Sequence, residues 1–355
     1  MKLAVKIPRT AAELINIALS FNDIYVATAV FGIANNKQRQ ALEDVMFVKR
    51  RNMLSLASWE HTPAFVLQAL SKKSNDVAVQ LRLANRSEKK SLSHVGDATN
   101  DLDLLKQAKD SKLPLPALKL LSASQNAAVR ARVVANRSFP ASCLADFVTD
   151  KSTAVRRGLA TRTDISIELM QQLSIDVDSW VKQRLGRNPS LSIAFMQLLA
   201  IDADDEVRRA VTRNTNCPIT LLEQLARDHC AWVRAGVAYQ VNANNELMYH
   251  LFKEADIETD IDVLSGIASN PNTPSEIMLS LSQHKEADVR RGVILNPKAE
   301  RATLLPLLQD SYYLHRILLV TNKRLNDSDR WFLHDDPDYR VRFLVFKWFA
   351  DEFQK

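Results

Sequence analysis

The sequence has 355 residues and is poor in glycine and cysteine, with seven and three respectively. No apolar run approaches the ~18 residues that a membrane-spanning helix requires, so we expect no membrane span. Residues 1–8 carry lysines but no apolar segment of secretory-signal length. The cysteines form no Cys-x-x-Cys pair and their number is odd. This usage predicts free thiols in a reducing, cytoplasmic location at Cys143, Cys217 and Cys230.

Common catalytic and cofactor-binding motifs are also missing. The seven histidines form no His-Glu-x-x-His motif and no cluster with cysteine. The sequence contains no Gly-x-Ser-x-Gly, no P-loop and no Gly-x-Gly-x-x-Gly. We therefore expect no catalytic residues, no metal and no cofactor, and we interpret the chain as non-enzymatic.

A pattern with a period of 26 residues runs along most of the chain and is clearest from Val207 to Asp228. Each repeat starts at an anchor position, has an aliphatic residue at +4, and has an apolar residue at +18 in almost every copy. A fixed period in this range indicates an array of structural repeats. After Val233 the period is interrupted once, by four extra residues. The anchors are Val129, Val155, Val181, Val207, Val233, Val263, Val289, His315 and Val341.

The spacing within a repeat predicts two short helices. Apolar residues at 0, +3 and +4, and again at +14, +15 and +18, each follow one helix face. Proline at +11 suits the first turn of the second helix, and asparagine at +7 tolerates the left-handed conformation that ends a helix and can bond neighbouring backbone. A lone helix pair cannot bury its apolar face, so about twelve pairs stack. The fold class predicted is all-α, a right-handed α-solenoid.

The consensus Val-Arg-Arg-x-Val-x-x-Asn-x-x-x-Pro-x-x-Leu-Leu-x-x-Leu-x-x-Asp resembles the leucine-rich repeat variant family, a HEAT-like group of helical repeats. The resemblance covers Asn52 to the C-terminus. The best-known member of that family carries a cysteine-ligated iron–sulfur cluster ahead of its repeats. The cysteines of this chain are scattered within repeats, so the resemblance does not imply a cluster.

Repeat quality divides the chain into segments. We expect an N-terminal helical cap over residues 1–50, degenerate repeats over 51–128, regular repeats over 129–340 and a C-terminal capping helix over 341–355. An acidic insertion at 253–262 lacks the glycine and the spacing of a calcium-binding loop, so we interpret it as a solvated loop rather than a divalent-cation site.

Two charged columns travel together along the repeats. Basic residues at +1 would form a ridge that attracts phosphates, but an acid stands five residues before nearly every anchor. We interpret the two columns as an Asp–Arg ladder in which the aspartate caps the first helix and pairs with the arginine. The columns are Arg130, Arg156, Lys182, Arg208, Arg234, Arg290, Arg316 and Arg342, and Asp150, Asp176, Asp202, Asp228, Glu258, Asp310 and Asp336.

The exposed face of the first helix is the candidate binding site. Positions +2 and +6 point away from the apolar positions, carry no matching acid column, and belong to the helix layer that lines the concave surface of many solenoids. They suit an acidic or phosphorylated partner, although ordinary solvated arginines give the same pattern. The residues predicted are Arg157, Arg162, Gln183, Arg187, Arg209 and Arg213, with Thr161 and Arg184 nearby. Trp180 and Trp232 precede anchors, and we expect them to pack between repeats rather than to stack on bases.

The net charge of +6 comes from a basic excess in the N-terminal third. A cluster there could contact phosphates or be simply solvated: Lys72, Lys73, Arg82, Arg86, Lys89 and Lys90. The leading hypothesis is a monomeric, non-enzymatic scaffold that holds an acidic protein partner on its concave surface. The alternative is a nucleic-acid-binding protein, by analogy with HEAT-like alkylpurine DNA glycosylases that cradle duplex DNA. No catalytic motif of those enzymes is matched, and DNA binding would require unpaired basic charge that continues from this cluster to the first-helix face.

Overall fold

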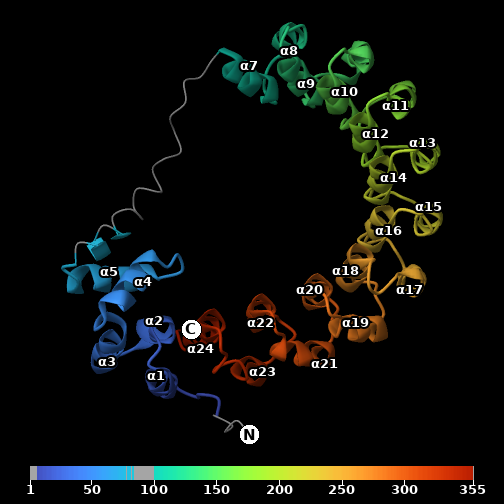
Figure 1. The fold of residues 1–355 in the computed structure, drawn as a ribbon. Coiled ribbons are helices and arrows are strands. Elements are labelled where there is room, and N and C mark those ends of the chain that lie inside the picture. The colour runs from blue at the N-terminus through green and yellow to red at the C-terminus, as the bar shows by residue number, and fades with distance from the viewer. Residues whose placement is uncertain (1–5, 77, 81, 84–99, 355) are drawn as a thin grey trace. The chain divides into compact units, whose positions relative to one another are not determined.

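The computed structural model describes residues 6–76, 78–80, 82–83 and 100–354. Every regular element in this described part is helical, and successive helices pack on one another as an α-solenoid (Figure 1). The chain divides into two compact units. We call residues 96–298 the continuous unit and residues 1–95 with 299–355 the split unit.

The continuous unit alternates two kinds of helix, as the repeat spacing predicts. First helices pack on one another from repeat to repeat, and second helices lie on the outer side of this unit's curve (Figure 1). The first helices are α7 (Asn100–Lys109), α9 (Ala127–Ala135), α10 (Thr153–Ala160), α12 (Ser179–Gly186), α14 (Asp205–Thr212), α16 (Ala231–Ala238), α18 (Ile261–Ser269) and α20 (Ala287–Leu295). The second helices are α8 (Leu115–Ser122), the 3-10 pair η2 (Ala141–Cys143) and η3 (Ala145–Thr149), α11 (Ile167–Ser174), α13 (Ile193–Leu199), α15 (Ile219–Leu225), α17 (Asn245–Glu254) and α19 (Ser275–Ser282).

The core runs between these two layers and consists of the periodic apolar residues. The anchor Val207 and Val211 at +4 are both fully buried. Small residues at +3 allow first helices to approach closely: a Cβ on Gly158 would lie 2.9 Å from the carbonyl oxygen of Ala131. The predicted prolines stand one residue earlier than expected, since Pro218 is the N-cap of α15 rather than part of its first turn.

Asparagine at +7 ties most repeats to the one before them. The Asn214 Nδ2 donates to the carbonyl oxygens of Gly186 and Asn188, at 2.9 and 2.7 Å, and its Oδ1 accepts from the Asn216 N–H. The predicted bonding to neighbouring backbone is therefore confirmed, but the predicted left-handed conformation is wrong. Among the described residues, Asn22 is the one non-glycine residue with a positive φ. The side-chain amide donates to carbonyl oxygens of the preceding repeat, so no left-handed residue is needed to end the helix. The same contacts recur at Asn136, Asn188, Asn270 and Asn296.

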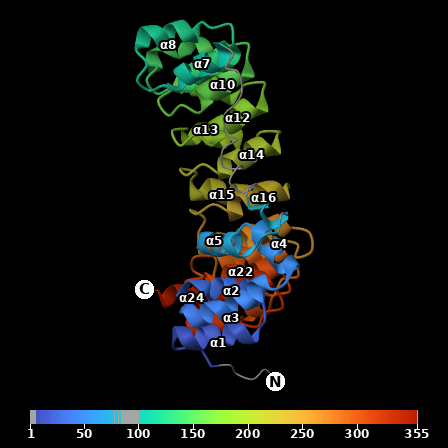
Figure 2. The ribbon, with the colours of Figure 1, turned by 90° about the vertical axis from the view of Figure 1, so that its left-hand side faces the viewer.

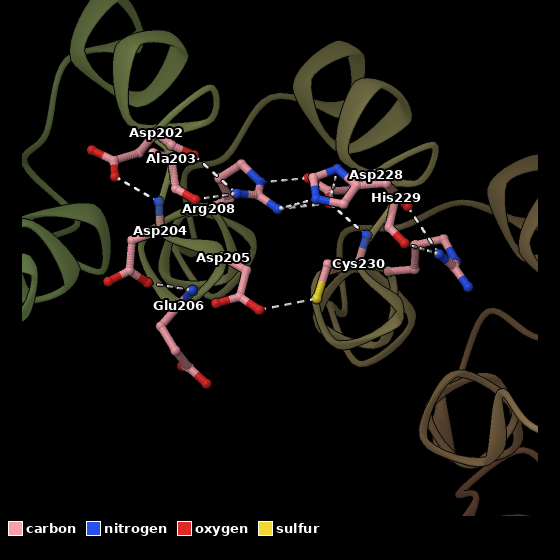
Figure 3. A network of polar contacts seen from close by, with 10 residues as sticks. Asp202, Ala203, Asp204, Asp205, Glu206, Arg208, Asp228, His229 and Cys230 are labelled. Atoms are coloured by element: carbon pink, nitrogen blue, oxygen red, sulfur yellow. Dashed lines mark hydrogen bonds and ion pairs between the residues drawn. The ribbon is translucent and has the colours of Figure 1, made fainter.

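The Asp–Arg ladder is present and links consecutive repeats (Figure 3). Arg208 Nε donates to Asp228 Oδ2 of the next repeat at 2.7 Å, and its Nη1 donates to the carbonyl oxygen of Asp202 at 2.9 Å. The expected capping role is wrong, because the aspartate at −5 accepts from an N–H two residues later while the residue at −3 is the N-cap. Matching pairs are Arg130–Asp150, Arg156–Asp176, Lys182–Asp202 and Arg316–Asp336.

The acidic insertion supplies one rung of the ladder. Arg234 Nη2 lies 2.8 Å from Asp260 Oδ2, whereas Glu258, the acid expected there, pairs with Lys285. Asp260 stands three residues before its anchor and is the N-cap of α18. The four extra residues have shifted the acid toward the helix, and the ladder continues through them.

The split unit joins helices from the two ends of the chain. Helices α1 and α2 pack on α24 (Figure 2), where Tyr25 stacks on Tyr339 with ring centroids 4.0 Å apart. Its helices are α1 (Ala11–Ser20), α2 (Ile24–Val30), η1 (Phe31–Ile33), α3 (Asn36–Phe47), α4 (Arg50–Ser58), α5 (Ala64–Lys73), α21 (Arg301–Leu304), η4 (Leu305–Gln309), α22 (Tyr313–Val320), α23 (Asp327–Trp331) and α24 (Tyr339–Glu352).

The ladder also crosses this junction. Arg342 Nε donates to Asp23 Oδ2 at 3.0 Å, and Asp23 is the N-cap of α2. Asp23 thus pairs with an arginine at +1 from an N-cap position, as Asp260 does with Arg234. The N-terminal helix α2 therefore occupies the place that the next repeat would take after α24.

Candidate functional site

The candidate site is a group of side chains on α10, α12, α14 and α16, the first helices of four consecutive repeats. We call it the arginine face. Most of its members come from positions −1, +2 and +6, which point away from the buried anchors, and Arg184 at +3 is exposed beside them. They are Arg157, Trp180, Gln183, Arg184, Arg187, Glu206, Arg209, Arg213 and Trp232.

Two arginine–tryptophan pairs mark the ends of this face. The Arg157 guanidinium carbon lies 5.0 Å from the ring centroid of Trp180, and that of Arg209 lies 3.3 Å from the ring centroid of Trp232. Both distances fall within cation–π range. In each pair the arginine is at +2 of one repeat and the tryptophan at −1 of the next, so the face is built across repeat boundaries.

The two paired arginines differ in their acidic partners. Arg157 Nη2 lies 2.9 Å from Asp178 Oδ2, at −3 of the following repeat. The corresponding position after Arg209 is Cys230, whose Sγ lies 3.2 Å from Asp205 Oδ2 (Figure 3). Arg209 is 7% exposed, its Nε has no hydrogen-bond partner, and its ion pair with Glu206 spans 3.8 Å.

The centre of the face carries surplus positive charge. Burial, followed by repulsion from Arg213 and Arg184, lowers the pKa of Arg187 below its ordinary value. Burial and then Arg213 lower the pKa of Arg209 in the same way, while Glu206 opposes both shifts. Four guanidinium groups therefore lie close together around one carboxylate. Arg184 and Arg213 are exposed, and the Arg187 Nε is buried without a partner.

A pocket of ≈ 390 Å³ opens within this cluster. It is lined by Trp180, Gln183, Arg184, Arg187 and Glu206. The lining offers an aromatic wall, an amide, two guanidinium groups and one carboxylate, so its donors outnumber its single acid and suit a carboxylate ligand.

The two tryptophans are not buried between repeats as expected, although each ring lies across a repeat boundary against an arginine of the preceding repeat. Trp180 is 57% exposed and Trp232 is 37% exposed, and the Trp232 Nε1 donates to Glu206 Oε1 at 2.6 Å. The expectation followed the average burial of tryptophan. The −1 position faces the same side as +2, so an arginine one repeat earlier covers one face of the ring. The sequence holds this signal, because Trp180 and Trp232 each follow an arginine at +2.

Arg162 lies outside the arginine face. It is 3% exposed and stands at +7, the asparagine position. Its guanidinium donates to the carbonyl oxygens of Val134, Asn136 and Phe139, and to Asp164. Its hydrogen bonds to the preceding repeat have the same sequence offsets as those of the asparagines. Arg162 therefore joins two repeats, as expected of a residue at +7, and is not available to a ligand. Of the other predicted residues, Arg157, Gln183, Arg187, Arg209 and Arg213 are brought together on the face.

The N-terminal basic cluster is only partly within the described residues. Lys72 and Lys73 end α5, where Lys73 pairs with Glu43 at 2.9 Å, and Arg82 is exposed. The other three predicted members lie outside the described residues: Arg86, Lys89 and Lys90.

No group of three or more His, Cys, Asp or Glu side chains in the described part of the chain is placed to hold a metal ion. Over the same residues, no helix is long and apolar enough to cross a membrane. The three cysteines are free, with Cys217 buried.

No family model matches the sequence, and no curated protein matches it. The chain is similar to a solved structure described as a leucine-rich repeat variant with a novel repetitive protein structural motif. The two are 23% identical over 63% of this chain and 86% of the other, with a TM-score of 0.42. Its description names a leucine-rich repeat variant, the group that the sequence consensus resembles. The α-solenoid assignment rests on the chain's own helix pairs.

Proposed function

We propose that this protein is a non-enzymatic scaffold that holds an acidic segment of a partner protein on the arginine face. The observation that carries the proposal is the surplus of positive charge around Arg187, where four guanidinium groups share the single carboxylate of Glu206. Grouping four guanidinium groups is unfavourable in the free protein, and a carboxylate-rich ligand relieves that repulsion. The exposed ring of Trp180 adds an apolar wall of the kind found at protein interfaces.

The number of available cations favours a protein segment over duplex DNA. Arg157 is paired with an aspartate and Arg209 is buried, which leaves Arg184, Arg187 and Arg213 to meet a ligand. Three phosphate contacts on B-DNA would give a salt slope of about −2.7, well short of the 6–10 contacts made by typical binders. A short acidic segment needs no more than these three.

The proposal is tested by fluorescence anisotropy at two salt concentrations. The probes are a labelled Asp/Glu-rich peptide, a labelled DNA duplex and a labelled single strand. We expect saturable binding of the peptide, its loss in the Arg187→Ala/Arg213→Ala double variant, and weak, non-saturating binding of both DNAs. Arg227→Ala is the matched control, since Arg227 is exposed but follows α15 in the outer layer.

Two outcomes would contradict the proposal. Peptide binding that survives in the double variant would place the partner elsewhere on the chain. Saturable duplex binding with a steep salt dependence, lost in the double variant but kept in Arg227→Ala, would identify the face as a nucleic-acid site.

A further inference from the structure

The arginine face has a fixed spacing, because it is built from equivalent positions in consecutive repeats. Arg187 and Arg213 both stand at +6, as the C-cap residues of α12 and α14. Tyr239 is the C-cap of α16, at the same position one repeat further. These three helices pack side by side, and packed helices lie about 8–10 Å apart. Successive +6 side chains therefore start from points separated by that distance.

The spacing fits a ligand in the polyproline II conformation. Such a chain rises about 3.1 Å per residue with three residues per turn, so residues three apart lie about 9 Å apart on the same face. In a β-strand, residues three apart point to opposite faces, so both acids could not reach the row. In a helix, acids three or four residues apart lie only about 5–6 Å apart and would reach one arginine, and a helical ligand would instead need acids about seven residues apart.

The cationic side chains of the face come from two successive repeats. Arg184, Arg187 and Glu206 line the pocket at α12 and the start of α14. Arg213 is the C-cap of α14, one repeat after Arg187, and it is exposed. The positive charge thus continues from one repeat to the next.

We infer that the partner segment is extended in the polyproline II conformation, runs across the repeats from α12 to α14, and carries an acidic side chain at every third residue. This inference rests on the proposed function and specifies the sequence pattern that the arginine face selects. One acid reaches Arg187 together with Arg184, and the next reaches Arg213.

The test uses labelled peptides of identical composition, each with two aspartates in a background of Gly, Ser and Pro. The prolines keep every peptide from forming a helix. In one peptide the aspartates stand at positions i and i+3. In two others they stand at i and i+2 or at i and i+4, and in the last they are adjacent. We expect the peptide with three-residue spacing to bind about tenfold more tightly than the adjacent one, the ratio for one charge-assisted contact.

The controls separate this inference from the proposed function. In Arg213→Ala the advantage of the three-residue spacing should vanish, leaving all peptides with the same weaker affinity, whereas Arg227→Ala should keep it. Equal affinity of all spacings for the native protein, together with lost binding in Arg187→Ala/Arg213→Ala, would overturn the extended register and leave the proposed function standing. Binding of every peptide that is unaffected by the double variant would overturn both.

Discussion

Arg162 offers the sharpest test of how the repeats are joined. Its side chain is fully enclosed and donates to three backbone carbonyl oxygens, those of Val134, Asn136 and Phe139. Arg162→Ala leaves all three without this donor in a buried place. The Asn136 carbonyl keeps its hydrogen bond from the Phe139 N–H. At about 1 kcal/mol for each hydrogen bond lost, we expect a fall of about 3 kcal/mol in the free energy of unfolding.

Arg162→Asn is the informative companion, because asparagine fills the same position in neighbouring repeats. The side chain of Asn188 donates to carbonyl oxygens 28 and 26 residues earlier, the same offsets that link Arg162 to Val134 and Asn136. Two of the three bonds should be recovered, leaving a loss of about 1–2 kcal/mol.

Urea denaturation followed by circular dichroism measures these losses, and hydrogen exchange of α9 and α10 amides shows where they arise. The exposed control Arg227→Ala should change stability by less than about 0.5 kcal/mol. The reasoning is refuted if Arg162→Ala is no worse than that control. It is also refuted if Arg162→Asn is as damaging as Arg162→Ala, since the carbonyl bonds would then not be the cause.

Four further predictions follow from described contacts. Cys230 is the N-cap of α16 without a side-chain hydrogen bond, so Cys230→Asn should raise the free energy of unfolding by about 1 kcal/mol, measured by urea titration. Gly158→Ala should lower it by about 1–3 kcal/mol in the same assay, because the added Cβ meets backbone. The Arg130 hydrogen bond lowers the pKa of Asp150. The stabilisation from this ion pair is therefore complete above the unfolded pKa of about 3.9 and is lost as pH falls through the lower pKa of the folded state. Below pH ~4 the melting temperature should fall less steeply with pH in Asp150→Asn than in the native protein. Burial raises the pKa of Cys217 to about 11, so a thiol reagent at neutral pH should label it only after unfolding.

The fold could be predicted because its main determinant is local and repeated. A valine at each anchor and an aliphatic residue at +4 identify the buried face, and any single repeat can be read by comparison with its neighbours. The ladder was predictable for the same reason. Its capping geometry was not, since position −5 and position −3 both offer aspartates and only the backbone path decides which one caps.

The candidate site was harder to predict, since one residue type has different fates at nearby positions. Arg157 and Arg209 share position +2, yet their partners depend on a residue 21 positions later, Asp178 in one case and Cys230 in the other. Arg162 differs from a surface arginine only in its register. The contact of Asp23 with Arg342 lies outside the period altogether, so repetition carried no information about it.

The contact between Asp23 and Arg342 has a consequence for the order of folding. The two residues are 319 positions apart, so the packing of α2 on α24 depends on chain that is made much later than α2. At about 5–20 residues per second, a ribosome needs roughly 16–64 s to extend the chain from one to the other. During that interval α2 lacks α24, on which it packs in the folded protein through the stacking of Tyr25 on Tyr339. The repeats between them have mostly local contacts and can form while they are being made. Completion of the split unit is then a late step, after the intervening repeats have formed.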